Sequence, residues 1–221
     1  MVGLPAGNRV VVVAPHPDDE TIMCGGTVAA LVDRGVTVAL VAVSDGEAGG
    51  DPRLSRATVA SRRRDEQVHA AAVLGIRETI RLGLPDGLLR QHVSDLSAEL
   101  ARFLIEFGPG SILAPWWLDG HPDHEAVAEA IAMTVDDATE VWSGEVWGPL
   151  VPNRVVDVTN FMDKKLAAID CYPTAAAAVD LAALAALSRY RSAFGLGGHG
   201  HAEAFIALTG DAHRAAVAGP Q

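Results

Sequence analysis

The chain has 221 residues, 49% of them hydrophobic, and a formal net charge of -11 at pH 7 that arises from 28 acidic and 17 basic residues. This composition supports a sizeable core, so residues 1–221 are expected to form a single α/β domain. The acidic balance argues against nucleic-acid and anionic-membrane partners. No apolar run suggests a membrane span or a signal peptide, which favours a cytoplasmic protein.

The first half of the chain alternates short apolar runs with segments of helical character. The run from Val10 to Val13 is apolar at consecutive positions, which is typical of a parallel strand buried on both faces. The expected elements are a strand at 10–13, a helix at 25–33, a strand at 36–43, a helix at 55–74, a strand at 79–82, a helix at 93–107 and a strand at 111–114. This order predicts a Rossmann-like, three-layer α/β fold with a mostly parallel sheet.

The second half is less regular. Its expected elements are a helix at 123–133, strands at 145–147 and 155–158, helices at 161–171 and 179–194, and a last strand at 204–208. The glycine-rich segment 195–200 matches the dinucleotide-binding fingerprint by letter, but it follows a helix rather than a strand and is expected to be a loop. We expect His199 and His201 to be solvent-exposed there, and Cys24 and Cys171 to be free thiols.

Two clusters of imidazole and carboxylate side chains follow strand ends. One comes directly after the strand at 10–13, and the other follows the strand at 111–114 and opens a helix. The carboxyl ends of parallel strands open on one edge of a sheet, where ligands bind in α/β folds. A divalent cation could therefore collect ligands from both segments. The clusters comprise His16, Asp18, Asp19 and Glu20, and His121, Asp123 and His124.

These residue types suit a catalytic metal. One imidazole and one carboxylate from the first cluster, with one imidazole from the second, leave an open position on Zn²⁺ for a water, whose pKa falls to about 7. Of Asp18 and Asp19, one would bind the metal and the other would take the proton of that water. The remaining histidine of the second cluster would stabilise an oxyanion or protonate the leaving nitrogen, with Asp123 holding its ring. The set fits hydrolysis of an amide or ester.

The motifs also resemble those of a known family. Residues 14–20, Ala-Pro-His-Pro-Asp-Asp-Glu, and residues 121–124, His-Pro-Asp-His, are similar to the paired motifs of the LmbE-like, or PIG-L-like, zinc-dependent de-N-acetylases. Further similarity at residues 63–66, at Lys165 and at residues 204–205 extends the resemblance over most of the chain. It implies a metal-dependent hydrolase that removes an N-acyl group, with acetyl expected, from a small molecule that contains an amino sugar.

The resemblance implies a role for each matching residue. Asp18 would be the general base, and His121 would stabilise the oxyanion while Asp123 orients its ring. One Zn²⁺ per chain, with Fe²⁺ as the alternative metal, would have three protein ligands. These ligands would be His16, Asp19 and His124.

Three further residues are candidates for substrate binding. Arg63 would reach the substrate unless it is an exposed helical arginine. Trp117, next to Trp116, could stack on a sugar ring. Asp119 takes the position of a tyrosine that aids the intermediate in some family members. It is assigned to substrate binding, and the work of that tyrosine falls to a different residue or to none.

Other functions share these residues. An amidase acting on a mycothiol-type thiol conjugate would use the same site. A non-haem Fe(II) oxygenase also uses two histidines and one carboxylate, but those enzymes usually build the triad on a β-barrel, and they need oxygen and a co-substrate. A non-catalytic metal binder is less favoured, because binding requires neither Asp18 nor His121. The sequence leaves open which sugar is the substrate and whether the chain forms a homo-oligomer.

Overall fold

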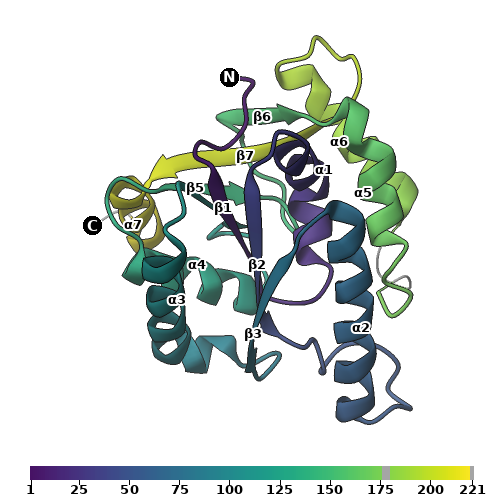
Figure 1. Ribbon diagram of the computed structural model, residues 1–221, viewed down its shortest axis with the longest axis vertical. Helices are drawn as coiled ribbons and strands as arrows, with labels where there is room; N and C mark the ends of the chain where they lie inside the picture. Colours follow the sequence, from purple (N-terminus) through teal and green to yellow (C-terminus); the bar gives the residue numbers. More distant parts are fainter. Residues whose placement is uncertain (176–179, 220–221) are drawn as a thin grey trace.

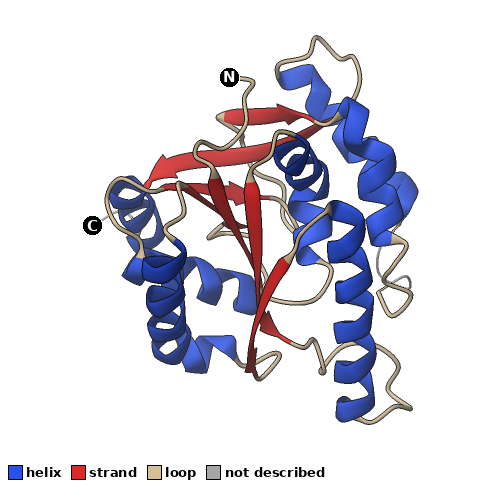
Figure 2. Ribbon diagram, viewed as in Figure 1, coloured by secondary structure: helices blue, strands red, loops and turns tan. Residues whose placement is uncertain are grey.

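The computed structural model describes residues 1–175 and 180–219 and is built around one seven-stranded sheet (Figure 2). The strand order is β3-β2-β1-β4-β5-β7-β6. Neighbours from β3 to β5 pair in parallel, and β7 runs antiparallel to both β5 and β6. This mostly parallel sheet confirms the predicted fold. The strands are β1 (Arg9–Ala14), β2 (Thr37–Ser44), β3 (Glu78–Leu84), β4 (Ser111–Pro115), β5 (Glu140–Gly144), β6 (Arg154–Asp157) and β7 (Ala202–Thr209).

Helices cover both faces of the sheet and complete the three layers. In Figure 1, α1, α2, α5 and α6 lie on one face, and α3, α4 and α7 lie on the other. The helices are α1 (Asp19–Asp33), α2 (Arg56–Leu74), α3 (Val93–Phe107), α4 (Pro122–Thr134), α5 (Met162–Ile169), α6 (Leu181–Arg191) and α7 (Gly210–Ala218). Three short 3-10 turns, at Leu89–His92, Thr159–Phe161 and Ser192–Phe194, precede α3 and α5 and follow α6.

The central strand β1 supplies both halves of the core. Val10 and Val12 pack in the cluster that includes side chains of α1 and α2, whereas Val11 and Val13 pack in the cluster that includes side chains of α3 and α4. All four valines are completely buried. Full burial of such a side chain stabilises the fold by about 1.5–3 kcal/mol. Side chains alternate between the faces of a strand, so two covered faces explain why this run is apolar at every position.

The prediction of a strand at 145–147 is wrong. The triplet Glu-Val-Trp occurs twice, at 140–142 and again at 145–147. The first copy lies in β5, between β4 and β7, where Val141 and Trp142 are buried. The second copy follows the strand in a non-regular segment. Pairing with strands distant in the sequence therefore decides between two identical triplets.

Helix α1 begins earlier than expected because it is built from two segments that meet at Cys24, whose backbone φ of -143° is not helical. The predicted start near residue 25 matches the second segment. Lys165 donates to the carbonyl of Ile22 at 2.7 Å and pairs with Glu203 at 2.6 Å. The Glu203 carboxylate accepts from the backbone N–H groups of residues 26 and 27. A buried ion pair thus satisfies backbone groups on both sides of the kink.

The remaining predictions were met in part. The helix expected at 179–194 corresponds to α6 and the turn after it, while residue 179 lies outside the described residues. Helix α7 was not predicted. Cys24 and Cys171 are free, as expected. Within the described part of the chain, none of the helices has the length and apolar character that a membrane crossing requires.

Candidate active site

The two predicted clusters meet at the carboxyl ends of β1 and β4. The Oδ2 atom of Asp19 lies 3.1 Å from Nδ1 of His16 and 3.2 Å from Nε2 of His124. All three side chains are buried, and His124 is completely so. Residues that are more than a hundred positions apart in the sequence therefore place imidazole nitrogens against the same carboxylate oxygen. The rings of His16, His121 and His124 also lie close enough together to hold one metal ion.

The other nitrogen of each imidazole faces a carboxylate. Nδ1 of His124 lies 2.7 Å from Oδ1 of Asp119. Nε2 of His16 lies 3.1 Å from Oδ1 of Asp86 and 3.2 Å from Oδ2 of Asp123. Carboxylates in this position fix the ring orientation of metal-binding histidines and raise their basicity.

This donor set fits a divalent cation. Metal–ligand bonds of about 2.0–2.1 Å in a tetrahedral site place neighbouring donors about 3.3 Å apart, close to the separations around Asp19. Nε2 of His124 is buried and has no hydrogen-bond partner among the described residues, because its contact with Asp19 lacks hydrogen-bond geometry. A buried nitrogen of this kind is costly unless another group, such as a metal ion, completes its environment.

The pKa shifts of these side chains also favour a bound cation. Burial alone would lower the pKa of His124, but the charges of Asp19 and Asp119 outweigh it and raise the pKa to about 9. Although burial opposes ionisation of Asp19, His124 and His16 hold its pKa well below the usual range. The carboxylates therefore favour positive charge on the rings. A bound cation would supply that charge in place of the protons.

Asp18 stands beside the donor cluster in an unusual conformation. Its φ is 113°, and no other non-glycine residue in the described ranges has a positive φ. Such a conformation costs about 1–3 kcal/mol and persists only where surrounding contacts impose it. Here Arg63 donates to the Pro17 carbonyl at 2.6 Å and to Oδ2 of Asp18 at 3.1 Å. Burial raises the pKa of Asp18 to about 8; the charge of Asp19 adds to the shift and Arg63 opposes it.

Glu20, which the sequence placed in the motif without a role, supports Asp18 from the protein interior. Its carboxylate is completely buried and accepts from the Asp18 N–H at 3.3 Å, the Thr21 hydroxyl at 2.9 Å and the Gln67 amide at 3.2 Å. The Tyr172 hydroxyl also donates to it. The first turn of α1 is therefore held by a buried polar network in which Asp18 is the member that lines the pocket.

His121 caps the start of α4. Its Nδ1 accepts from the backbone N–H of Asp123 at 3.2 Å, so the proton of the neutral ring is on Nε2. Its ring centroid lies 4.6 Å from that of His124 and 5.0 Å from that of His16. Burial and these two neighbours lower the pKa of His121, which keeps the ring neutral.

The pocket at this edge has a volume of about 350 Å³. Arg63 lines it and is buried, so the alternative of an exposed helical arginine is wrong. His199 is exposed and His201 half-buried, and neither is among the described residues that line the pocket. The other lining residues include His16, Asp18, Asp19, Asp86, His121 and Trp147.

Three predicted placements need correction. The Asp123 carboxylate faces His16 and accepts from the N–H groups of residues 87 and 89, so it does not orient the His121 ring. Asp119 lies under His124 with a fully buried side chain and does not line the pocket, because the backbone N–H groups of residues 146 to 148 draw it inward.

The third correction concerns the tryptophan. Trp117 packs edge-on against His213, with 5.8 Å between ring centroids, and does not line the pocket. Trp147 does line it, 68% exposed and 6.1 Å from His121 between ring centroids. Asp86 was not among the site residues predicted from the sequence. That residue follows the parallel strand β3, so the argument from strand ends could have identified it.

Comparison with known proteins agrees with this geometry. The GlcNAc-PI de-N-acetylase (PIG-L) family matches residues 11–135. Diacetylchitobiose deacetylase from Thermococcus kodakarensis is 30% identical over 181 residues, which are 73% of this chain and 67% of that protein. The solved structure of N,N'-diacetylchitobiose deacetylase from Pyrococcus horikoshii is similar with a TM-score of 0.74 and 25% identity, and covers 92% of this chain and 84% of that one.

A further solved structure shows the fold alone. The 4-carboxy-2-hydroxymuconate hydratase from Pseudomonas putida KT2440 has a TM-score of 0.78 and 23% identity, and covers 90% of this chain and 95% of its own. This architecture therefore carries more than one chemistry, and function has to be argued from the site. The family match spans more than half of the chain, and the protein belongs to the GlcNAc-PI de-N-acetylase (PIG-L) family.

Proposed function

We propose that this protein is a metal-dependent hydrolase that removes the N-acetyl group of an amino sugar or an amino-sugar glycoside. The observation that carries the proposal is that one nitrogen of His16 and one of His124 lie within 3.2 Å of the same oxygen of Asp19, with the carboxylate of Asp18 lining the pocket beside them. The two deacetylase relatives support the reaction class. The whole chain, residues 1–221, would act as one domain.

We infer that Zn²⁺ is the metal, because it favours nitrogen and oxygen donors, and the two nitrogen–oxygen separations at Asp19 suit a tetrahedral site. His16, Asp19 and His124 would hold it, and Asp119, Asp123 and Asp86 would orient the two imidazoles. When bound, the ion would lower the pKa of a water and polarise the acyl carbonyl.

Asp18 would act as the general base. Its carboxylate lines the pocket, and Arg63, which donates to it at 3.1 Å, favours the ionised form that can take a proton from a water. Arg63 and the Glu20 network would fix its orientation without binding the metal. The proton taken from water would later pass to the departing amine, so that acetate and the free amine are the products.

His121 would bind the developing oxyanion. Because its Nδ1 already accepts a backbone N–H, the neutral ring keeps its Nε2 proton for donation into the pocket. A preorganised donor of this kind, if removed, costs about 10²–10³-fold in kcat. Trp147 at the pocket rim would offer its indole face to the sugar ring.

The oxygenase alternative lacks support in this fold, because the ligands project from a mostly parallel sheet rather than from a barrel. Turnover that is unchanged without oxygen would separate the two reactions. A thiol-conjugate amidase would share the site, and none of the contacts among the described residues favours it over a deacetylase.

The proposal is tested by incubating the zinc-loaded protein with N-acetylglucosamine and N,N'-diacetylchitobiose and measuring released acetate and free amine. Asp18→Asn should retain bound metal and lose about 10²–10⁴-fold in turnover. Asp33→Asn, an exposed change at the C-terminal end of the helix that Asp18 precedes, should retain both. Wild-type turnover in Asp18→Asn would reject the base assignment, and no acetate from any N-acetylated sugar would reject the function.

A further inference from the structure

The chain between β5 and β6 carries Trp147 to the rim of the catalytic pocket. Residues 145–150 form what we call the rim segment, and their backbone is neither helical nor extended into a strand. The Trp147 side chain lines the pocket and is largely exposed, with its ring 6.1 Å from that of His121 between centroids. An irregular segment has no regular hydrogen bonds of its own, so its position depends on contacts with other parts of the chain.

One set of contacts joins the rim segment to the loop between β4 and α4. The carboxylate of Asp119 accepts from the N–H groups of residues 146, 147 and 148, and Nε1 of Trp116 donates to the Gly148 carbonyl at 3.1 Å. A Cβ atom at Gly148 would lie 2.6 Å from the Asp119 carbonyl oxygen, so a larger residue would force the two segments apart. The middle of the rim segment is therefore fixed against this loop.

A single arginine holds the two ends of the rim segment. Arg191 is the last residue of α6, and its Nε donates to Oε2 of Glu145 at 2.9 Å. Its Nη2 donates to Oε1 of the same carboxylate and to the Leu150 carbonyl at 3.0 Å. Oε1 of Glu145 also accepts from the N–H of Leu150 at 2.8 Å. The guanidinium thus ties the first residue of the segment to the last.

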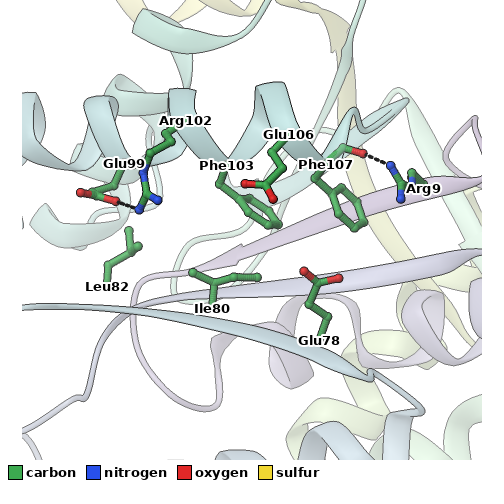
Figure 3. A pocket seen from close by; sticks show the side chains of 9 residues that line it. All are labelled: Arg9, Glu78, Ile80, Leu82, Glu99, Arg102, Phe103, Glu106 and Phe107. Atoms are coloured by element: carbon green, nitrogen blue, oxygen red, sulfur yellow. Dashed lines mark hydrogen bonds and ion pairs between the residues drawn. The ribbon is translucent and has the colours of Figure 1, made fainter.

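Burial distinguishes this ion pair from those on the surface. Arg191 is 5% exposed and Glu145 is 9% exposed, and a bidentate pair of this kind fixes geometry as well as charge. Figure 3 shows the contrasting case, in which Arg102 pairs with Glu99 beside the cavity between α3 and β3. That pair is exposed and lies within one helix, so it contributes little and holds no second segment.

We propose that Arg191 is a positioning residue for substrate binding, because it fixes the rim segment and so keeps the indole of Trp147 beside the pocket. The inference rests on the proposed deacetylase function and adds to it a residue that sets affinity for the sugar. Arg191 is not among the described residues that line the pocket, so it acts through Trp147. A ring that is already ordered loses less conformational entropy when a sugar binds.

The first test measures kcat and KM of the zinc-loaded protein for release of acetate from N,N'-diacetylchitobiose. Arg191→Met should raise KM by up to about tenfold, the effect of losing an aromatic contact, and should change kcat by less than about twofold. Arg102→Met, at the exposed pair, should change neither value. In Trp147→Ala protein, Arg191→Met should raise KM no further. A fall in kcat as large as the rise in KM, or an equal rise with and without Trp147, would overturn the proposal.

A second variant separates positioning from stability. Arg191→Met leaves the buried carboxylate of Glu145 without its partner, which also lowers the free energy of unfolding. The double variant Glu145→Gln/Arg191→Met removes both charges and keeps an acceptor for the Leu150 N–H. It should regain stability in urea denaturation and still show the raised KM. A stable double variant with the KM of the wild type would overturn the proposal.

A spectroscopic measurement separates this inference from the function itself. The four tryptophans are labelled as 5-fluorotryptophan, and Trp147→Phe assigns the ¹⁹F resonance of residue 147. In Arg191→Met this resonance should narrow as the ring gains motion, while that of the buried Trp142 stays unchanged. Such narrowing supports the positioning role even if the wild type releases no acetate. An unchanged Trp147 resonance overturns the role, even if the wild type is an active deacetylase.

Discussion

Asp119 was predicted from the sequence to bind substrate, but in the structure it contacts His124 instead. Its substitution therefore gives the sharpest prediction. Its side chain is completely buried, with Oδ1 2.7 Å from Nδ1 of His124. Its Oδ2 accepts from the N–H groups of Val146, Trp147 and Gly148 at 3.3, 3.0 and 3.3 Å. Asp119→Ala leaves these groups without their acceptor and frees the His124 ring to rotate.

The size of the effect follows from these contacts. A buried group that loses its hydrogen-bond partner costs about 1–3 kcal/mol, so several such groups should lower the free energy of unfolding by about 3 kcal/mol or more, less whatever entering water recovers. Loss of a carboxylate that orients a metal-binding histidine should weaken metal affinity about 10–100-fold. Asp119→Asn keeps the shape and should show the smaller loss in both quantities.

Two measurements check this prediction. Urea denaturation of the metal-free protein gives the free energy of unfolding, and titration against a competing chelator gives the metal affinity. Wild-type values of both in Asp119→Ala would refute the reasoning. A raised KM with stability and metal affinity unchanged would return Asp119 to a role in substrate binding.

Three further predictions concern single side chains. Lys165→Met leaves the buried carboxylate of Glu203 without its partner and should lower the free energy of unfolding, measured by urea denaturation, by about 3–5 kcal/mol. Lys164→Met, at an exposed position, should lower it little. Equal effects of the two substitutions would contradict the stabilising role of the Lys165–Glu203 pair. Burial lowers the pKa of His213, so the neutral ring contributes stability above pH 6.5, and this contribution is lost as the pH falls below that value. Between about pH 7.5 and 5.5, His213→Gln should therefore lose less free energy of unfolding than the wild type. Identical losses in the two proteins would contradict this role of His213. Trp147→Ala should raise KM more than Trp117→Ala does, and the reverse order would restore Trp117 as the sugar contact.

The sequence predicted those parts of the fold that local pattern determines. The consecutive valines of β1 indicated a strand with two covered faces, and both cores confirm it. The residues that converge on Asp19 could also be predicted, because the ends of β1 and β4 must open on one edge. Whether a residue lies at the end of a strand can be predicted from the sequence, and in a parallel sheet this also fixes the edge on which it lies.

The pairings within the site could not be predicted in the same way. Which carboxylate faces which ring depends on distances between elements: Asp123 faces His16 rather than His121, and Asp86 enters from the turn after β3. The two Glu-Val-Trp triplets are locally identical, and only pairing with β4 and β7 distinguishes them. The early start of α1 depends on Lys165 and its carboxylate partner, which come from distant parts of the chain.

The central claim is that His124 belongs to the group that holds the metal and that His121, although its ring is only 4.6 Å away, does not. The most direct measurement is zinc bound per chain after dialysis, for the wild type, His124→Ala and His121→Ala. We expect about one zinc in the wild type and in His121→Ala, and a large loss in His124→Ala. Full occupancy in His124→Ala, or loss of zinc only in His121→Ala, would contradict the placement of His124 among the metal ligands.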